Sequence, residues 1–395
     1  MTSPSAERRT RWLRGTRRLR STWWLRHLPL ALALAAAAAC ASGRGGRAVE
    51  HRLRLEIGER GLDPARIVLP FETTPEMRSW ARATVSRGGV EEQRLQQLLL
   101  ALLERDGRKL RYDRNRTATA VEVWRDGVAN CLSFTHLFVG LAREVGLPVY
   151  YLRIADSPRY EREGDLVVAS EHVAAAWGPP HRRKVLDFSE EPVGEYHQTQ
   201  VVSDLTAVAL YYSNLGAGRI RAGRLDEALD ALSVATRLDP ELADGWVNQG
   251  VALRAGGHRE EAEAAFRRAL EANPSMISAY NNLASLLRQA GRDTEARRLL
   301  EVADRQANRD PFTYLALGDL ALAEGRLDEA ARFYRRALRR HPGRAEPLAA
   351  LGRCALAAGQ RGDAQRWLRR AHRADPTEPR TVELRRLLGG PARSG

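Results

Sequence analysis

The second half of the chain repeats its pattern of small, large and polar residues every 34 positions, beginning near residue 209. Each unit holds two segments whose apolar residues recur at helical spacing. Three series of small residues stand in register: Gly216, Gly250, Ala284, Gly318 and Gly352; Ala228, Ala262, Ala296, Ala330 and Ala364; and Ala235, Ala269, Ala303, Ala337 and Ala371. This pattern predicts five helix pairs over residues 209–378, because prolines close most of the units and end their second helices.

The period and the small-residue series resemble the tetratricopeptide repeat, an all-α solenoid. In such an array, small residues let the two helices of a unit approach, and large residues fill the space between units. Residues 379–388 would add a capping helix, and the Gly- and Pro-containing tail to residue 395 is expected to be disordered. The resemblance implies a concave groove that binds a protein or peptide partner.

Three asparagines mark this predicted groove: Asn214, Asn248 and Asn282 occupy the sixth position of their units. In some members of the family an asparagine there contacts the backbone of a bound peptide. Members that clamp a terminal carboxylate have a lysine just before it, whereas here the preceding residues are Ser213, Val247 and Asn281. A carboxylate clamp is therefore not expected. The alternative is that the asparagines satisfy local backbone groups.

Before residue 200 the pattern mixes helical and strand-like segments, which predicts a globular α+β domain over residues 59–200. Helical spacing is found in Thr74–Val85 and Val90–Asp106. The sequence predicts strands at Lys109–Tyr112, Leu147–Ile154, His172–Trp177 and Lys184–Phe188, with a polar loop before the third.

Gly178-Pro-Pro-His181 is a strong turn signal between the last two of these strands. If these four residues close a hairpin, Trp177 pairs with Arg182, and counting outward places His172 directly opposite Asp187. Directly opposed residues share a face, with Cβ atoms about 4.5–5.5 Å apart. A carboxylate at that distance can orient an imidazole.

Cys131 lies where a glycine-containing loop runs into an amphipathic helix that ends near Gly146. At a helix N-terminus the macrodipole and the unpaired N–H groups favour a thiolate and can hold a developing oxyanion. His136 lies on another side of this helix, where we expect it at the boundary of the core rather than as a partner of Cys131.

These segments together resemble the transglutaminase-like superfamily, a branch of the papain-like cysteine enzymes, over roughly residues 59–200. The resemblance implies that Cys131 is a nucleophile, His172 its base and Asp187 the orienting carboxylate. Asn130 stands where members often have a glycine, and Val173 stands where they often have a tryptophan. Trp124 and Asn130 are the alternatives for a side-chain oxyanion donor.

The first 39 residues carry eight arginines and one acidic residue, followed by an apolar run over residues 28–39. This pattern is typical of a secretory signal peptide, and the apolar run is too short for a membrane span. Cys40 and the Ala-Ser-Gly that follows resemble a lipoprotein cleavage site, which implies a lipid anchor on Cys40. Cleavage after one of the preceding alanines is the alternative. Residues 40–58 would be a spacer.

Charge and cysteine content narrow the function classes. The formal net charge of +14 falls to about +7 without the leader, and the remaining arginines are interspersed with acidic residues on the repeat helices. No basic stripe with exposed aromatics is present, so we expect no nucleic acid partner. Three cysteines cannot form a disulfide framework, and we read Cys354 as a packing residue. No spacing suggests a metal site or a cofactor.

Two functions fit this organisation. One is a cell-envelope cysteine hydrolase or acyltransferase that attacks an amide bond of a protein or peptide, with the repeats binding a partner. The other is a non-enzymatic envelope scaffold whose first domain is degenerate. In both, we expect the α+β domain and the repeats to be separate modules, with the thiol site complete before residue 200.

Overall fold

The computed structural model describes residues 46–103, 110–163, 166–188, 199–306 and 311–389. The predicted leader, the predicted lipid site Cys40 and the tail 390–395 lie outside the described residues. Within the described ranges, no helix combines the length and the apolar character needed to cross a membrane.

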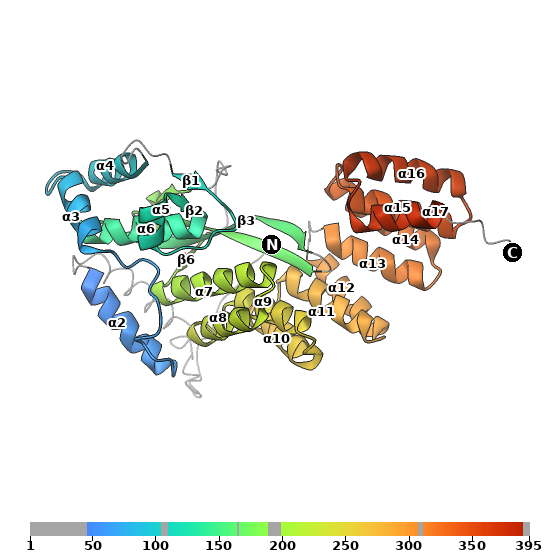
Figure 1. The fold of residues 1–395 in the computed structure, drawn as a ribbon, viewed down its shortest axis with the longest axis horizontal. Helices are drawn as coiled ribbons and strands as arrows, with labels where there is room; N and C mark the ends of the chain where they lie inside the picture. The colour runs from blue at the N-terminus through green and yellow to red at the C-terminus, as the bar shows by residue number, and fades with distance from the viewer. Residues whose placement is uncertain (1–45, 104–109, 164–165, 189–198, 307–310, 390–395) are drawn as a thin grey trace, which may run out of the picture. The chain divides into compact units, whose positions relative to one another are not determined.

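The first part of the chain mixes helices and strands, as the sequence predicts. Its helices are α2 (Gly46–Glu59), α3 (Pro75–Thr84), α4 (Glu91–Leu103), α5 (Ala120–Asp126) and α6 (Cys131–Glu144). Its strands are β1 (Arg111–Tyr112), β2 (Val128–Ala129), β3 (Val149–Glu163), β4 (Leu166–Trp177), β5 (Lys184–Leu186) and β6 (Thr199–Val202). Figure 1 shows α3, α4 and α5 gathered around α6.

Helix α2 corrects the prediction of a spacer over residues 40–58. Leu53 and Ile57 of this helix are almost completely buried in the core, and Val49 packs against it. These three residues recur every four positions, which places them on one face of a helix. Charged residues around them hide the pattern in the sequence.

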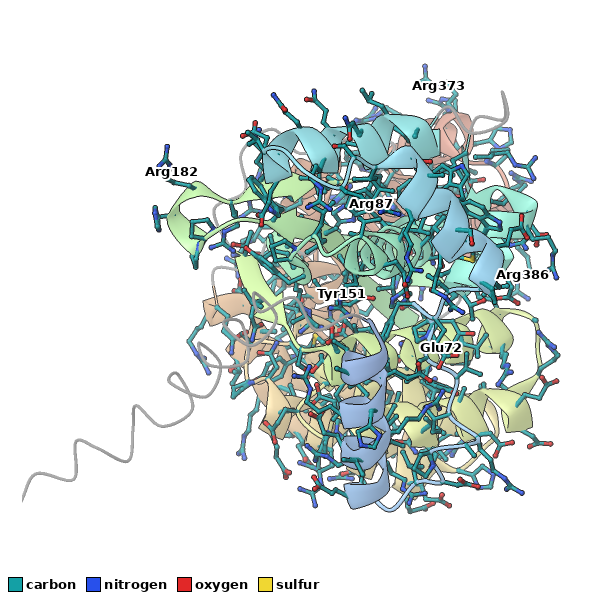
Figure 2. The ribbon with its side chains drawn as sticks, turned by 90° about the vertical axis from the view of Figure 1, so that its left-hand side faces the viewer. Glu72, Arg87, Tyr151, Arg182, Arg373 and Arg386 are labelled. Carbon is teal, nitrogen blue, oxygen red and sulfur yellow. The ribbon has the colours of Figure 1, made fainter. Side chains whose placement is uncertain are left out.

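The central sheet has the strand order β5-β4-β3-β6, and every neighbouring pair is antiparallel. Trp177 pairs with Lys184 and not with Arg182 as predicted. The turn is two residues longer because Pro180–Arg182 form a short 3-10 helix. Arg182 accordingly projects away from the body of the chain (Figure 2). A shift of two residues keeps every side chain on its predicted face of the sheet.

The β3–β4 hairpin is longer than predicted and replaces the expected polar loop. Backbone pairing continues to Glu163, which is opposite Leu166. The many polar residues of this segment hide the strand pattern in the sequence. The register shifts between Ile154 and Arg159, which marks a β-bulge or another irregularity in the pairing, and Ile154 is the partner of His172. Bulges bend a hairpin and are common beside functional sites.

Helix α6 is the centre of the core, since every residue from Leu132 to Ala142 is buried. A helix that is covered on all sides must contact several elements, and α6 contacts α3, α4, α5, β3 and β4 among others. At Gly140 the backbone of Phe71 comes so close that an added Cβ would lie 2.3 Å from its carbonyl oxygen. A glycine is therefore required at this crossing.

The second part is an all-helical array, which confirms the predicted repeats. The helices are α7 (Asp204–Arg221), α8 (Leu225–Leu238), α9 (Ala243–Ala255), α10 (Arg259–Ala272), α11 (Ile277–Gln289), α12 (Asp293–Arg305), α13 (Pro311–Ala323), α14 (Leu327–Arg340), α15 (Ala345–Ala357), α16 (Arg361–Ala374) and α17 (Pro379–Gly389). Consecutive helices pack in pairs, and α17 packs on α15 and α16 as the predicted cap would.

The repeated glycines mark where the two helices of one unit cross. A Cβ on Gly250 would lie 2.6 Å from the ring of Phe266, and one on Gly318 would lie 2.4 Å from the ring of Tyr334. Both rings therefore fill space within their own unit. The prediction that large residues fill the gaps between units is wrong for these two residues.

The two parts share one hydrophobic core, which corrects the expectation of separate modules. Leu205 and Val208 of α7 and Leu238 of α8 lie in the same buried cluster as α2, α6 and β3. The backbone N–H of Val68 also donates a hydrogen bond to the Tyr212 hydroxyl at 2.9 Å. The first helix pair of the array is thus part of the core of the α+β region.

His136 lies inside this shared core and not at its boundary as predicted. Its Nδ1 atom is 2.9 Å from the Tyr151 hydroxyl, and the imidazole packs edge-on against Tyr211 of α7. Figure 2 shows Tyr151 in the interior. Burial, assisted by the positive charge of Arg143, lowers the pKa of His136 to about 3. The imidazole is therefore neutral in the folded protein at neutral pH.

We expect the free energy of unfolding to fall as the pH drops from about 6.5 toward 4, because His136 gains a proton in the unfolded chain before it does so in the folded chain. One such proton corresponds to a slope of up to about 1.4 kcal/mol per pH unit at 25 °C. His136→Gln should flatten this slope in urea titrations, whereas His51→Gln, at an exposed histidine, should not. Equal slopes for wild type and His136→Gln would contradict the prediction.

Candidate active site

The segment before α6 brings Cys131 to the start of that helix. Helix α5 ends at Gly127, whose φ of 65° lets the chain turn directly into β2. Asn130 then caps α6, because its Oδ1 atom accepts a hydrogen bond from the N–H of Ser133 at 2.8 Å. Cys131 is the first residue of the helix and is half-buried.

Thr135 ties this first turn to strand β4. Its hydroxyl oxygen lies 2.8 Å from the carbonyl oxygen of Cys131 and 3.4 Å from that of Val173. Val173 directly follows His172 on β4. The helix turn that carries the thiol and the strand that carries the imidazole are therefore held together beside both groups.

His172 and Asp187 are in contact, although their strands are not in the predicted register. The Nε2 atom of His172 is hydrogen-bonded to Oδ1 of Asp187, which lies directly after β5. The observed register extends to place Asp187 opposite Ala174, so His172 and Asp187 form a diagonal pair on one face of the sheet. The Asp187 side chain is 5% exposed and that of His172 is 23% exposed.

Phe188 holds this end of β5 in place. Its ring centroid lies 3.7 Å from that of Phe134 and 5.7 Å from that of Phe138, and both of these residues belong to α6. Asp187 is therefore fixed by the residue next to it. Neither the positioning role of Phe188 nor the tethering role of Thr135 is predicted from the sequence. The sequence feature that could have pointed to Phe188 and Thr135 is their position, because each lies within four residues of a predicted site residue.

The protonation state of His172 follows from its two neighbours. Burial alone lowers the pKa of His172, but hydrogen bonds to Asp187 and Cys131, together with the charges of these groups, raise it to about 10. Because Nε2 faces Asp187, Nδ1 is the ring nitrogen left for Cys131. The imidazole is consequently a cation at neutral pH, and a cation beside a thiol stabilises the thiolate.

The structure thus brings Cys131, His172 and Asp187 together from α6, β4 and the end of β5.

The structure does not favour Asn130 as an oxyanion donor, because that side chain caps the helix and its Nδ2 atom donates to the Thr117 hydroxyl at 3.2 Å. Trp124 is 8% exposed and packs edge-on against Trp80, with ring centroids 5.0 Å apart. Among the described residues, no group of three or more His, Cys, Asp or Glu side chains is arranged to hold a metal ion.

The three groove asparagines differ from one another. Asn214 and Asn248 are half-buried, and Asn248 donates a hydrogen bond to the Ser213 hydroxyl at 2.9 Å, which links α9 to α7. Asn282 has no exposed surface. Asn248 therefore pairs with a side chain of the neighbouring helix and not with a local backbone group. Asn282 is not accessible to a peptide in this conformation.

Comparison with known proteins identifies the repeats. One model of the tetratricopeptide repeat matches residues 321–388, and a second model of this repeat matches residues 213–274 and 247–311. Repeats of this kind generally bind protein or peptide partners. The chain matches no curated protein.

Several solved repeat proteins are similar to part of the chain. YrrB, described as having an unusual peptide-binding site, is 22% identical, with 45% of this chain and 92% of YrrB covered and a TM-score of 0.35. MamA from Desulfovibrio magneticus RS-1 is 20% identical, with 43% and 97% covered and a TM-score of 0.37. PilF from Pseudomonas aeruginosa is 19% identical, with 46% and 82% covered and a TM-score of 0.42. None of these similarities transfers a function to this chain.

Proposed function

We propose that this chain is a transglutaminase-like cysteine hydrolase or acyltransferase that acts on an amide bond of a protein or peptide. One observation carries the proposal: the His172 imidazole is hydrogen-bonded to the carboxylate of Asp187 through Nε2 and also interacts with the Cys131 side chain. This is the arrangement of an activated nucleophile, its proton carrier and an orienting group. The repeats supply a surface for a protein partner.

The reaction starts from a Cys131 thiolate beside the His172 cation, and the imidazole stays protonated at neutral pH because its pKa is raised to about 10. The Cys131 thiolate attacks the carbonyl carbon of the amide and forms a tetrahedral oxyanion. Ser133 N–H is occupied by Asn130, and Phe134 N–H donates to the Asn130 carbonyl. The N–H groups of Cys131 and Leu132 are therefore the candidates to hold the oxyanion.

Collapse of this intermediate breaks the C–N bond. The departing amine takes the proton from His172, and the acyl group remains on Cys131 as a thioester. Water or an amine then attacks the thioester while His172 accepts its proton, which releases an acid or a new amide and restores the thiolate–imidazolium pair. Asp187 stays ionised and keeps Nδ1 directed at the sulfur throughout.

We expect His172 to stay protonated up to about pH 9, because its pKa is raised to about 10 by Asp187 and Cys131. NMR titration of the imidazole, assigned by comparison with His172→Gln, measures this. Asp187→Asn should lower the pKa by about one unit or more, since it removes the negative acceptor. His341, whose pKa is lowered by burial, should be unaffected. A wild-type pKa near 6.5 would contradict the assigned contacts.

Cys131 should be labelled by iodoacetamide at pH 7, and labelling should fall by about tenfold or more in His172→Ala, because the cation that stabilises the thiolate is lost. Peptide mass spectrometry on the full-length protein measures Cys131 and Cys354 at once. Cys354 is the matched control, since it is buried and its Sγ lies 3.2 Å from the Leu327 carbonyl oxygen. It should react slowly in both proteins.

The outcome of this labelling also separates the enzyme from the scaffold. Equal labelling of Cys131 with and without His172 would mean that the imidazole does not activate the thiol. The first region would then be a degenerate binding module in an envelope scaffold, and the proposed chemistry would be wrong.

We also propose that the protein is exported to the cell envelope and anchored by a lipid on Cys40. The support is the sequence of the first 43 residues alone, with its basic start, apolar run and Cys-Ala-Ser-Gly. Mass spectrometry of the mature protein should find acyl chains on an N-terminal Cys40, and Cys40→Ala should abolish them. A mature N-terminus without acyl chains would instead indicate a periplasmic or secreted protein.

A further inference from the structure

Ion pairs join the second helices of neighbouring units in the middle of the array. Arg267 of α10 donates a hydrogen bond to Glu295 of α12 at 2.7 Å. Arg292, which comes directly before α12, donates to Glu263 of α10 at 2.8 Å. Both arginines at the junction between α10 and α12 therefore have an acidic partner on the neighbouring helix.

The corresponding junction two units later, between α14 and α16, has lost one of these acids. Ala331 stands where α10 has Glu263, whereas Arg335 stands where α10 has Arg267. The acid across the junction, Asp363, pairs with an arginine of its own helix. Among the residues that the structure describes, Arg335 has no ion-pair partner.

A second arginine at this junction has lost its acid in the same way. Arg336 of α14 donates to both carboxylate oxygens of Asp304 of α12, at 2.9 and 3.2 Å. One unit later these positions hold Arg370 of α16 and Leu338 of α14. The Arg370 guanidinium instead lies over the ring of Trp367, 4.7 Å from its centroid. No carboxylate pairs with it in the described part of the chain.

A cavity of about 440 Å³ lies at this junction of α14, α15 and α16 (Figure 1). Arginines of α14 and α16 line it, together with an apolar wall that includes Leu351 and Trp367. Two carboxylates also line it, Asp328 and Asp363, and both lie in the first turn of their helices. The cavity therefore places positive charge that lacks carboxylate partners beside an apolar wall.

The surface around the cavity is strongly basic. Arg332, Arg335, Arg336 and Arg339 lie at helical spacing on α14, and each is followed 34 positions later by an arginine of α16. All of these arginines except Arg336 are exposed, and Figure 2 shows Arg373 projecting from the surface. Like charges three or four positions apart on a helix repel one another. An acidic partner would relieve this repulsion.

We propose that the cavity between α14 and α16 binds an acidic segment of a partner protein. One carboxylate of the segment takes the place beside Arg335 that Glu263 has beside Arg267, and an apolar side chain packs on the wall that contains Trp367. Arginine and a carboxylate form strong, charge-assisted hydrogen bonds, often as two parallel bonds. The inference deepens the partner binding proposed above for the repeats and does not depend on the thiol chemistry.

The observations favour a protein segment over a nucleic acid or a membrane surface. The Trp367 ring is half-buried and lies beneath the Arg370 guanidinium, so it offers no open platform on which a base can stack. The headgroups of a membrane would contact the exposed arginines but leave the cavity unfilled. An extended protein segment supplies a carboxylate and an apolar side chain together.

A fluorescently labelled peptide of repeating Glu-Glu-Leu tests the proposal, with its anisotropy measured against the full-length protein. Replacing both exposed cavity arginines, by Arg335→Gln and Arg366→Gln, should weaken binding by about tenfold or more, because charge-assisted hydrogen bonds are lost. The matched control is Arg267→Gln with Arg298→Gln, which removes two exposed arginines from the same repeat positions two units earlier. It should change binding by about twofold or less. Equal weakening in the two double variants, or no binding to the wild type, would overturn the proposal.

A single substitution tests the same site by supplying the missing acid. Ala331→Glu restores the carboxylate that α10 has at Glu263, so it should occupy Arg335 and weaken binding of the peptide by about tenfold. Ala331→Gln adds nearly the same volume without the charge and should have a smaller effect. Equal effects of the two substitutions would contradict the assigned place of the carboxylate.

Other ligands separate the remaining possibilities. A peptide of repeating Gln-Gln-Leu should bind about tenfold more weakly than the acidic peptide, and equal binding would overturn the proposal. Tighter binding of phosphatidylglycerol vesicles or of a single-stranded oligonucleotide, lost in the Arg335→Gln and Arg366→Gln variant, would assign the surface to a lipid or a nucleic acid instead. None of these readouts involves Cys131. Failure of the proposed chemistry would be seen separately, as Cys131 labelling that does not depend on His172.

Discussion

The packing of α6 against the sheet is the constraint on which the rest of the structure depends. This helix is buried along nearly its whole length, and it carries Cys131 at its first residue. Thr135 holds its first turn to β4, and Phe134 and Phe138 hold the residue after Asp187. A change in how α6 sits on the sheet would therefore move the thiol, the imidazole and the carboxylate relative to one another.

Electrostatics within the site follow from this packing. Two groups that are negative when ionised flank one imidazole in a largely buried position, and their combined effect outweighs the cost of burying its charge. His136, only five residues after Cys131, shows the opposite outcome. Its neighbours are a tyrosine hydroxyl and an arginine, so burial leaves it neutral. Helix α6 thus contains one histidine, His136, and lies beside another, His172. Their surroundings move the two pKa values in opposite directions.

The sequence predicted what depends on local pattern and on repetition. The repeats were predictable because one set of small residues recurs 34 positions apart, and the start of α6 was predictable from its loop and apolar spacing. The contact between His172 and Asp187 was predicted from a four-residue turn. The observed turn is two residues longer, because Pro180–Arg182 form a 3-10 helix. The contact survives because a two-residue shift preserves the face. Helix α2, which replaces the spacer predicted over 40–58, and the long hairpin were not predicted. Charged residues surround the apolar positions of α2 in the sequence, and these positions find apolar neighbours only when distant helices pack against them.

The shared core has a consequence for the order in which the chain folds. Domains generally fold as units while the chain emerges, N-terminal parts first. Here the cluster around α6 also needs Leu238 and Leu242, which lie beyond the last strand, β6. The region that carries the thiol cannot complete its core until the first helix pair of the array has also emerged, from the ribosome or, in an exported chain, from the membrane. Until then its apolar surface stays open to chaperones or to association with other chains.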